Sequence, residues 1–337
     1  MITPTLIALL IAGLATGLIW FCSSRLEVLS EQLSSHYDLP DVVRGGVITA
    51  VASSFPELSS VVISTVWHGE FELGVAAIIG SAIFNILVIP GVCTLASRKL
   101  EADRDIVYKE MLFYLLAIAI FSLALACGVV FHPSENASHS GYVSRSLALL
   151  PLFAYLLYLY IQWQDSQDSS QEKPTKEPVN IKRAWGMLVV CLIVLALGVE
   201  LLVRSAIRLG EIFETPSFLW GLTIIAAGSS LPDLFISLKT SREGEDTTSL
   251  ANVLGSNTFD LLVAVPIGVL IAGASLFNFG RSVPLLGCLA GSTLLVFVLM
   301  RNQMNLRRRD ALIMLGAYGL FVGWLILESI GMVNLLR

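Results

Sequence analysis

The sequence predicts an all-α membrane protein of ten transmembrane helices, built as two inverted repeats of five with both termini outside. Three observations lead to this fold class. Of the 337 residues, 55% are hydrophobic and only 14% are charged, and the mean hydropathy is +0.78, far from the balance of a soluble domain. The apolar residues gather into runs long enough to cross about 30 Å of hydrocarbon. An unusual polar motif inside these runs occurs twice, half a chain apart.

Ten apolar runs are candidates for spanning helices, which need roughly 20 residues each. They cover residues 4–22, 45–66, 73–97, 111–131, 146–163, 184–203, 216–238, 249–280, 282–300 and 311–327. The first run could be a secretory signal, but no basic segment precedes it and no small-residue cleavage pattern follows before Arg25. We therefore expect it to be retained as a helix.

The stretches after the first and sixth runs keep a helical period but become amphipathic, which predicts extensions that reach the membrane surface. Glu200 and Arg204, four residues apart in the second stretch, are expected to pair on one helix face. A structural role for this pair is favoured over a place in an ion pathway, because surface helical pairs are common.

The distribution of Lys and Arg predicts the orientation, since cytoplasmic loops carry an excess of basic residues. With the N-terminus outside, most of the 21 basic residues fall on the cytoplasmic side. Those that fall outside or near the outer helix ends are Arg145, Arg204, Arg208, Arg281 and Arg337. The expected orientation is therefore N-out/C-out.

Two pairs of motifs show that the halves of the chain are copies of one another. "SSFPE" at residues 53–57 aligns with "SSLPD" at residues 229–233, and "GSAIFN" at residues 80–85 aligns with "GSNTFD" at residues 255–260. Each copy holds five predicted helices, so the second copy must be inverted relative to the first. Inverted repeats with interrupted helices near the membrane midplane are typical of secondary transporters.

The repeats set the domain organisation. We expect a first repeat over residues 1–163 with helices 1–5, a cytoplasmic linker over residues 164–183, and a second repeat over residues 184–337 with helices 6–10. The linker region is polar, contains proline and is too short to form a regulatory domain.

Inside the predicted spans, a serine precedes a carboxylate or amide by four residues four times. The pairs are Ser53 with Glu57, Ser81 with Asn85, Ser229 with Asp233, and Ser256 with Asp260. A spacing of four puts both side chains on one helix face, one turn apart. Four such faces could line one site with hydroxyl, amide and carboxylate oxygens, which hard cations such as calcium and sodium prefer.

Two prolines are expected to free backbone oxygens near these pairs. Pro56 and Pro232 have no N–H, so the carbonyls of Ala52 and Gly228 should lose their helical partners. At membrane depth such carbonyls are tolerated where they line a cavity or meet another partner such as a cation. A purely structural polar network is the alternative, but three acidic residues in the spans would make it costly.

The sequence argues against zinc or copper, because no histidine or cysteine shares the pattern. His36, His68, His132 and His139 fall in loops or at helix ends and are interpreted as solvated. The cysteines have no CxxC spacing and are expected to be small buried hydrophobes: Cys22, Cys93, Cys127, Cys191 and Cys288.

These motifs resemble the alpha repeats of the calcium/cation antiporter superfamily, specifically the prokaryotic type of sodium/calcium exchanger. The resemblance covers both repeats and nearly the whole chain. It implies a secondary antiporter, not an enzyme, in which helices 1 and 6 slide across the bundle to alternate access. It also implies Glu57 and Asp233 as central calcium ligands, completed by Asn85 and Asp260. Further hydroxyl or backbone oxygens for sodium and calcium would come from Ser53, Ser54, Ser81, Ser229, Ser230 and Ser256, and outlying sodium-site carbonyls from Ala50 and Ala226.

More than one ion could be coupled to calcium transport. Two features resemble those of the potassium-dependent exchangers: Asp233 together with Asp260, and "GSAIFN" in the first repeat. They leave potassium co-transport open. Three ionised carboxylates, with Glu57 as the third, would balance three sodium ions, or one calcium and one potassium. The proton-coupled branch has Gly-Asn before the acidic residue where this chain has serines, so sodium is favoured over protons.

Two other classes of protein could also carry acidic residues inside membrane helices. An intramembrane aspartyl hydrolase could use Asp233 and Asp260, but the sequence has no GxGD-type motif and the repeat pairs these residues with Glu57 and Asn85 instead. A cation channel would carry flux without a counter-ion.

The sequence also suggests where the protein lies and what it binds. The protein should lie in the inner membrane of a prokaryote, with no cofactor beyond the transported ions, no nucleic acid and no obligatory protein partner. Asn136 begins an "NAS" sequon on a predicted outer loop, a tripeptide that is common by chance.

Overall fold

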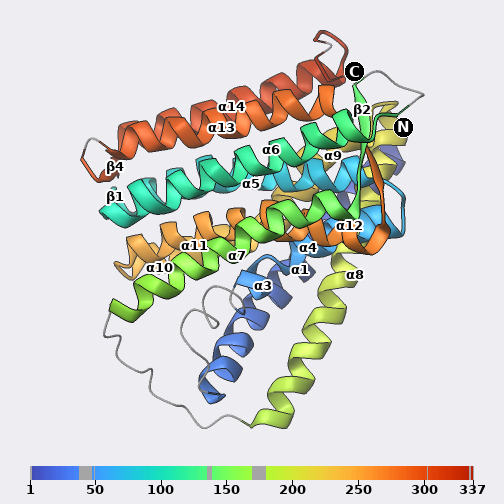
Figure 1. Cartoon of the computed structure of the whole chain (residues 1–337). Helices are drawn as coiled ribbons and strands as arrows, with labels where there is room; N and C mark the ends of the chain where they lie inside the picture. Colours follow the sequence, from blue (N-terminus) through green and yellow to red (C-terminus); the bar gives the residue numbers. More distant parts are fainter. Residues whose placement is uncertain are drawn as a thin grey trace.

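The computed structural model describes residues 2–37, 48, 50–134, 139–168, 180–301, 303–333 and 335–336. In these residues the chain forms a bundle of long helices with two small antiparallel sheets at its ends (Figure 1). Nine of the described helical segments are long and apolar enough to cross a membrane, and one shorter apolar helix accompanies them. The all-α class predicted from the sequence is confirmed.

The first half of the chain contains the helices that correspond to the first five apolar runs. They are α1 (Ile2–His36), α3 (Ala50–Ser53), α4 (Phe55–Val66), α5 (Phe71–Ser97), the π-helix η2 (Ile106–Glu110), α6 (Met111–Phe131) and α7 (Arg145–Asp168). The predicted extension beyond the first run is confirmed, because α1 continues without a break to His36.

The second half contains a corresponding series of helices. They are α8 (Ile181–Phe213), α9 (Ser217–Trp220), the π-helix η3 (Gly221–Ile225), α10 (Ala226–Arg242), α11 (Asp246–Phe259), the π-helix η4 (Asp260–Ala264), α12 (Val265–Ala272), α13 (Phe279–Arg301) and α14 (Arg308–Ser329). The predicted run over residues 249–280 is wrong at its end. Gly273, at φ +95°, ends α12, and the next residues form a strand rather than further helix.

Two short sheets connect loops from opposite halves of the chain. β1 (Lys99–Glu101) pairs with β4 (Asn305–Arg307), and β2 (Ser140–Val143) pairs with β3 (Ser275–Asn278), both antiparallel. The two sheets lie at opposite ends of the bundle (Figure 1). The sequence did not predict them, because strands of three or four residues carry no usable period.

α5 lies at the centre of the bundle and is buried along nearly its whole length, as expected for a helix that is apolar on all sides. The backbones of α5 and η3 approach each other closely at two glycines. A Cβ on Gly80 would come within 2.5 Å of the Leu222 carbonyl oxygen, and one on Gly221 within 2.7 Å of the Leu73 carbonyl oxygen. Only glycine permits both approaches.

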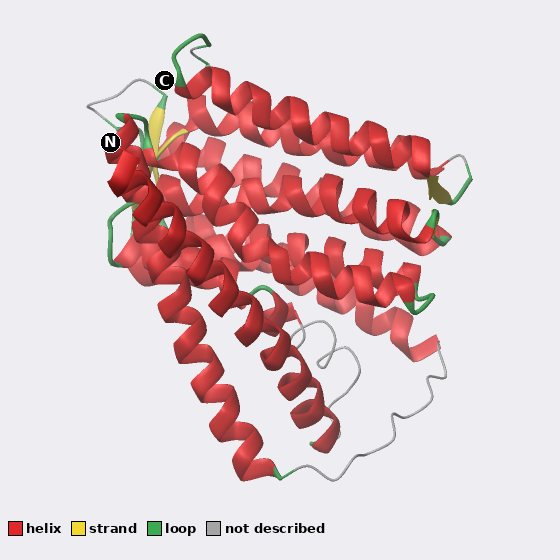
Figure 2. Ribbon diagram, turned by 180° about the vertical axis from the view of Figure 1, so that it is seen from behind, coloured by secondary structure: helices red, strands yellow, loops and turns green. Residues whose placement is uncertain are grey.

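α1 and α8 pack along one another and run at an angle to the other helices, which is visible from both sides (Figure 1, Figure 2). Leu10 and Leu14 of α1 and Ile193 and Leu197 of α8 are exposed, as expected for a surface that faces lipid. These two helices therefore form a pair at the side of the bundle, here called the α1–α8 pair.

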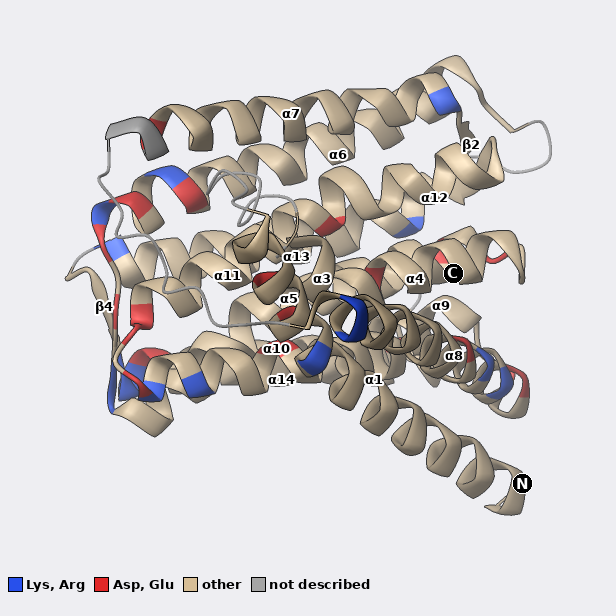
Figure 3. Ribbon diagram, turned by 90° about the horizontal axis from the view of Figure 1, so that it is seen from below, with Lys and Arg blue, Asp and Glu red and all other residues tan. Residues whose placement is uncertain are grey.

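The charged residues are unevenly distributed. Most of the described Lys and Arg residues lie at the end of the bundle that carries β4 (Figure 3). The two chain ends lie at the opposite end (Figure 1). The middle of the predicted linker, residues 169–179, and Asn136 lie outside the described residues.

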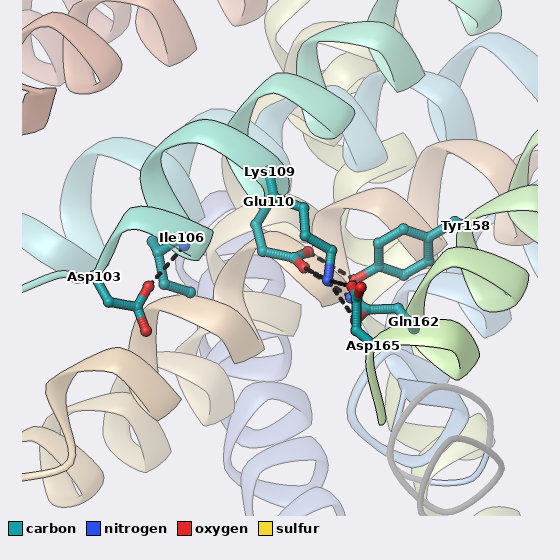
Figure 4. Close-up of polar contacts among 7 residues, drawn as sticks. All are labelled: Asp103, Ile106, Lys109, Glu110, Tyr158, Gln162 and Asp165. Atoms are coloured by element: carbon teal, nitrogen blue, oxygen red, sulfur yellow. Dashed lines mark hydrogen bonds and ion pairs between the residues drawn. The ribbon is translucent and has the colours of Figure 1, made fainter. Parts of the chain in front are cut away.

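A polar cluster joins η2, which directly precedes α6, to α7 (Figure 4). Tyr158 donates to a Glu110 carboxylate oxygen at 2.9 Å, and Gln162 donates to the other at 2.7 Å. Lys109 forms an ion pair with Asp165 and donates to the Gln162 amide oxygen at 3.1 Å. The cluster satisfies the buried Glu110 and fixes α7 against α6.

Candidate cation site

The centre of the molecule holds the polar residues of both motif segments. Glu57 comes from α4, Asp233 from α10, Asn85 from α5, and Asp260 from the first turn of η4. Their relative exposures are 2%, 3%, 0% and 1%, so all four side chains are shielded from solvent. Most of the other predicted site residues are buried as well, namely Ser53, Ser54, Ser81, Ser229, Ser230, Ser256 and Ala226, and Ala50 is half-buried.

α5 connects the two motif segments through side chains one turn apart. The hydroxyls of Ser81 and Ser230 hydrogen-bond at 2.7 Å, and Ser81 also lies 3.4 Å from Glu57 Oε1, to which it donates. Asn85 Nδ2 donates to Asp233 Oδ2 at 3.3 Å. The predicted Ser81–Asn85 face therefore contacts both acidic motifs.

Serine hydroxyls engage the two alanine carbonyls of the predicted set. Ser53 donates to the Ala50 carbonyl at 3.2 Å, and Ser229 donates to the Ala226 carbonyl at 3.4 Å. The Ser53 and Ser256 hydroxyls also lie 3.4 Å apart, which links the first motif segment to α11.

Several oxygens in this centre have no hydrogen-bond partner although they are buried. They are Ser54 Oγ, Glu57 Oε2, Asn85 Oδ1, Asp260 Oδ1 and Asp260 Oδ2. Burying an ionised carboxylate without a partner is costly, and a cation would offset that cost. Among the described residues no three acidic, histidine or cysteine side chains gather closely enough to hold a metal. Hydroxyl, amide and carbonyl oxygens would therefore have to complete the coordination of a hard cation.

The backbone differs between the two motif segments. The helix is interrupted at Ser54 (φ −91°, ψ 12°), between α3 and α4, and Pro56 lies in the first turn of α4, where its missing N–H does no harm. α10 instead continues through Pro232 without a break. The expectation of an interrupted helix in both halves is therefore met only in the first.

Asn257 is a polar residue of this centre that the sequence did not single out. It is fully buried, its Oδ1 accepts a bond from Asn85 Nδ2 at 3.1 Å, and its Nδ2 donates to the Ala82 carbonyl at 3.2 Å. The signal was present in the motif comparison, because Asn257 aligns with Ala82, so only the second motif carries an amide at this position.

One histidine corrects a sequence prediction. His68 is not simply solvated: its Nε2 lies 2.9 Å from Glu200 Oε2, and its side chain is 20% exposed. The predicted Glu200–Arg204 pair on α8 is confirmed. The other three histidines are exposed, and all five cysteines are free thiols that are buried or half-buried.

These features define a class of protein: a helical membrane protein with a buried centre of hydroxyl, amide and carboxylate side chains between two similar motif segments. A family model described as sodium/calcium exchanger protein matches residues 7–164 and 183–327. The chain belongs to the sodium/calcium exchanger family. It is an integral multi-pass membrane protein and a transporter, not an enzyme.

Individual relatives extend this result. The chain is 26% identical over 271 residues to "Inner membrane protein YrbG" of Escherichia coli (strain K12), covering 78% of this chain and 79% of the relative. It is 29% identical over 267 residues to "Putative antiporter CaxA" of Alkalimonas amylolytica, covering 76% and 77%.

Two solved structures share the fold. The sodium-calcium exchanger NCX_Mj matches with a TM-score of 0.62 at 22% identity, over 96% of this chain and 99% of that chain. The H+/Ca2+ exchanger CAX matches with a TM-score of 0.72 at 16% identity, over 95% and 82%. At these identities the likeness concerns the fold alone.

Proposed function

We propose that the chain is a secondary active antiporter that exchanges calcium for sodium by alternating access. The observation that carries this proposal is the buried centre in which Glu57 and Asp233, from two matching motifs, face α5 together with carboxylate and amide oxygens that have no protein partner. Such an oxygen-only centre suits hard cations. Two proteins of the same fold, a sodium-calcium exchanger and an H+/Ca2+ exchanger, have names that agree with this chemistry.

Each predicted ligand has a proposed role. Glu57 and Asp233 bind calcium at the centre, and Asn85 and Asp260 complete it. Ser54 and Asp260 contribute oxygens that have no hydrogen-bond donor within the protein. The other serines supply hydroxyl or backbone oxygens, and the Ala50 and Ala226 carbonyls belong to outlying sodium sites.

The proposal includes the arrangement of the chain in the membrane. Residues 1–163 and 184–337 form two inverted repeats, the linker at residues 164–183 is cytoplasmic, and both termini are outside. The concentration of Lys and Arg at the end opposite the two chain ends supports this orientation (Figure 1, Figure 3). The two ranges matched by the family model, which flank the linker, support the division. The bilayer is the inner membrane of a prokaryote, as the name of the Escherichia coli relative suggests for that protein.

Sodium is the proposed coupling ion, with protons as the alternative and potassium co-transport open. The serines before both acidic residues support sodium, because hydroxyl oxygens can bind it without first losing a proton. An ionised Asp260 supplies a third negative charge, which would balance one potassium ion beside calcium.

The test is calcium uptake into proteoliposomes with sodium, potassium and proton gradients imposed one at a time. We expect an outward sodium gradient to drive uptake, and Glu57→Gln and Asp233→Asn to abolish it. Glu110→Gln is the matched control, since Glu110 is a buried carboxylate outside the site. Wild-type uptake in both site variants would overturn the proposal. Uptake driven by protons alone would favour the proton-coupled alternative, and flux without any counter-ion would indicate a channel.

A further inference from the structure

Glu200 is a buried carboxylate of α8 that the proposed ion site does not use. It is 8% exposed, and its two oxygens have partners from different parts of the chain. His68 Nε2 lies 2.9 Å from Oε2, and Arg204, one turn further along α8, pairs with Oε1. His68 belongs to the turn between α4 and α5, so this contact joins the α1–α8 pair to the rest of the bundle.

The contact borders an open cavity of about 630 Å³ between the first turns of α1 and the second half of α8. α8 contributes Arg204, Arg208 and Glu211 to its wall, and Arg208 pairs with Glu211 at 2.7 Å. α1 contributes only apolar residues there, such as Ile7 and Ile11. His68 therefore lies in the wall of a space that is open to the surroundings of the protein.

The charged residues at the start of α5 already have other partners. Glu70 accepts a hydrogen bond from Ser217 at 2.9 Å, and Glu72 pairs with Arg281 at 2.8 Å. Of the three residues in the contact, only His68 is of a type that ordinarily changes charge between about pH 5 and pH 8.

We propose that His68, Glu200 and Arg204 form a proton-sensitive latch that holds α8 against the turn between α4 and α5. The proposed topology puts the latch on the outer side of the membrane. Its role in transport rests on the proposed function, in which α1 and α8 move across the bundle. A doubly protonated His68 donates a charge-assisted hydrogen bond to the carboxylate, which is stronger than a neutral one. The latch thus tightens as the outer solution becomes acidic and loosens as it becomes alkaline.

Movement of α8 past the turn has to break the His68–Glu200 contact. A buried carboxylate that loses one of its partners is destabilised, so opening has an energetic barrier. The outer proton concentration consequently sets the rate of the step in which α8 leaves this position. Protons act here as modulators that bind apart from the calcium site.

The first test does not depend on transport. Hydrogen–deuterium exchange of the α8 segment around residues 200–208 is measured at about pH 6 and about pH 8, in purified wild-type protein, His68→Gln, Glu200→Gln and His132→Gln, comparing variants at the same pH. His132 is an exposed histidine and serves as the matched control. We expect His68→Gln to raise exchange about threefold or more at the lower pH and less at the higher pH, with His132→Gln unchanged. Equal exchange in His68→Gln and wild type at both pH values would overturn the latch.

The second test measures sodium-driven calcium uptake against the pH of the solution facing the latch. The wild type and His132→Gln should slow as this solution becomes acidic, whereas His68→Gln and Glu200→Gln should show a flattened profile. A pH profile in His68→Gln identical to that of the wild type would overturn the role of the latch in transport. Wild-type protein that shows no sodium-driven uptake would contradict the proposed function instead, and hydrogen exchange would still decide whether the latch exists.

Discussion

The two motif segments, residues 53–57 and 229–233, have nearly the same sequence and yet satisfy their polar groups differently. In the first, the helix is interrupted at Ser54, and Ser54 Oγ and Glu57 Oε2 have no hydrogen-bond partner. In the second, α10 is continuous, Ser230 bonds to Ser81, and Asp233 accepts a bond from Asn85. Both segments therefore contact α5, but the first has one such contact, from Ser81 to Glu57 Oε1, and keeps two buried oxygens free, whereas the second has two.

The comparison teaches that a repeated motif does not impose a repeated local structure. Pro56 and Pro232 occupy equivalent positions, and π-helical residues precede both segments, at Ile48 in the first half and as η3 directly before α10 in the second. The two segments therefore differ in backbone and in side-chain partners although their prolines and carboxylates stand at matching places.

The largest expected effect concerns Asn85, which belongs to the first half of the chain but supports the second motif. Asn85→Ala removes its bonds to Asp233 and Asn257 and leaves buried acceptors unpaired. We expect a loss of about 1–3 kcal/mol in the free energy of unfolding and a fall in calcium affinity of about tenfold or more.

Thermal unfolding in detergent and calcium titration measure these two quantities for Asn85→Ala. Thr94→Val is the matched control, because Thr94 is equally buried in α5 but bonds only to the Pro90 carbonyl, away from the centre. Calcium affinity equal to that of Thr94→Val would mean that Asn85 neither binds calcium nor positions Asp233.

A pair of serine variants tests the difference between the segments directly. Ser230→Ala removes a hydrogen bond with Ser81 and should lower the free energy of unfolding by about 1 kcal/mol. Ser54→Ala removes a buried hydroxyl that has no partner within hydrogen-bond distance, so it should cost less than Ser230→Ala. Both should weaken ion binding if both serines are ligands.

The serine prediction is checked by unfolding the two variants without added calcium or sodium and then with each ion. Equal destabilisation of the two variants without ions would contradict the difference in hydrogen bonding. If calcium and sodium stabilise both variants against unfolding as much as they stabilise the wild type, these serines are not ion ligands.

The smallest effects are expected at the prolines. Pro56 lies in the first turn of α4, a favourable place, so Pro56→Ala should destabilise by about 0.4–1 kcal/mol through the entropy of the unfolded chain. Pro232 lies inside α10, where Ala could restore a backbone hydrogen bond. Pro232→Ala should therefore be less destabilising than Pro56→Ala or should stabilise. Thermal unfolding of both variants measures the two changes in stability. A larger loss in Pro232→Ala than in Pro56→Ala would show that the continuous α10 needs its proline.

Much of the fold could be predicted from the sequence, because a run of about 20 apolar residues has few structural options in a membrane. The runs at residues 73–97 and 111–131 match α5 and α6 closely. The end of the run at residues 249–280 was wrong, since an apolar strand after Gly273 looks like more helix when only hydropathy is read.

The candidate site was predictable to the extent that its residues repeat. Glu57, Asp233 and their serines stand out because both motifs carry them. Asn257 was missed, because its counterpart Ala82 is apolar and the repeat therefore gave no second example. The His68–Glu200 contact joins residues 132 positions apart, and no local pattern signals such a contact.

The small sheets have a consequence for how the protein is made. β1 is synthesised about a third of the way along the chain, but its partner β4 covers residues 305–307 of 337. β2 likewise waits for β3, more than a hundred residues later. Contacts between such distant residues form late. During biosynthesis, β2 and β1 therefore stay unpaired until residues 275–278 and 305–307, respectively, have been made, so both sheets form only after much of the second half has been synthesised.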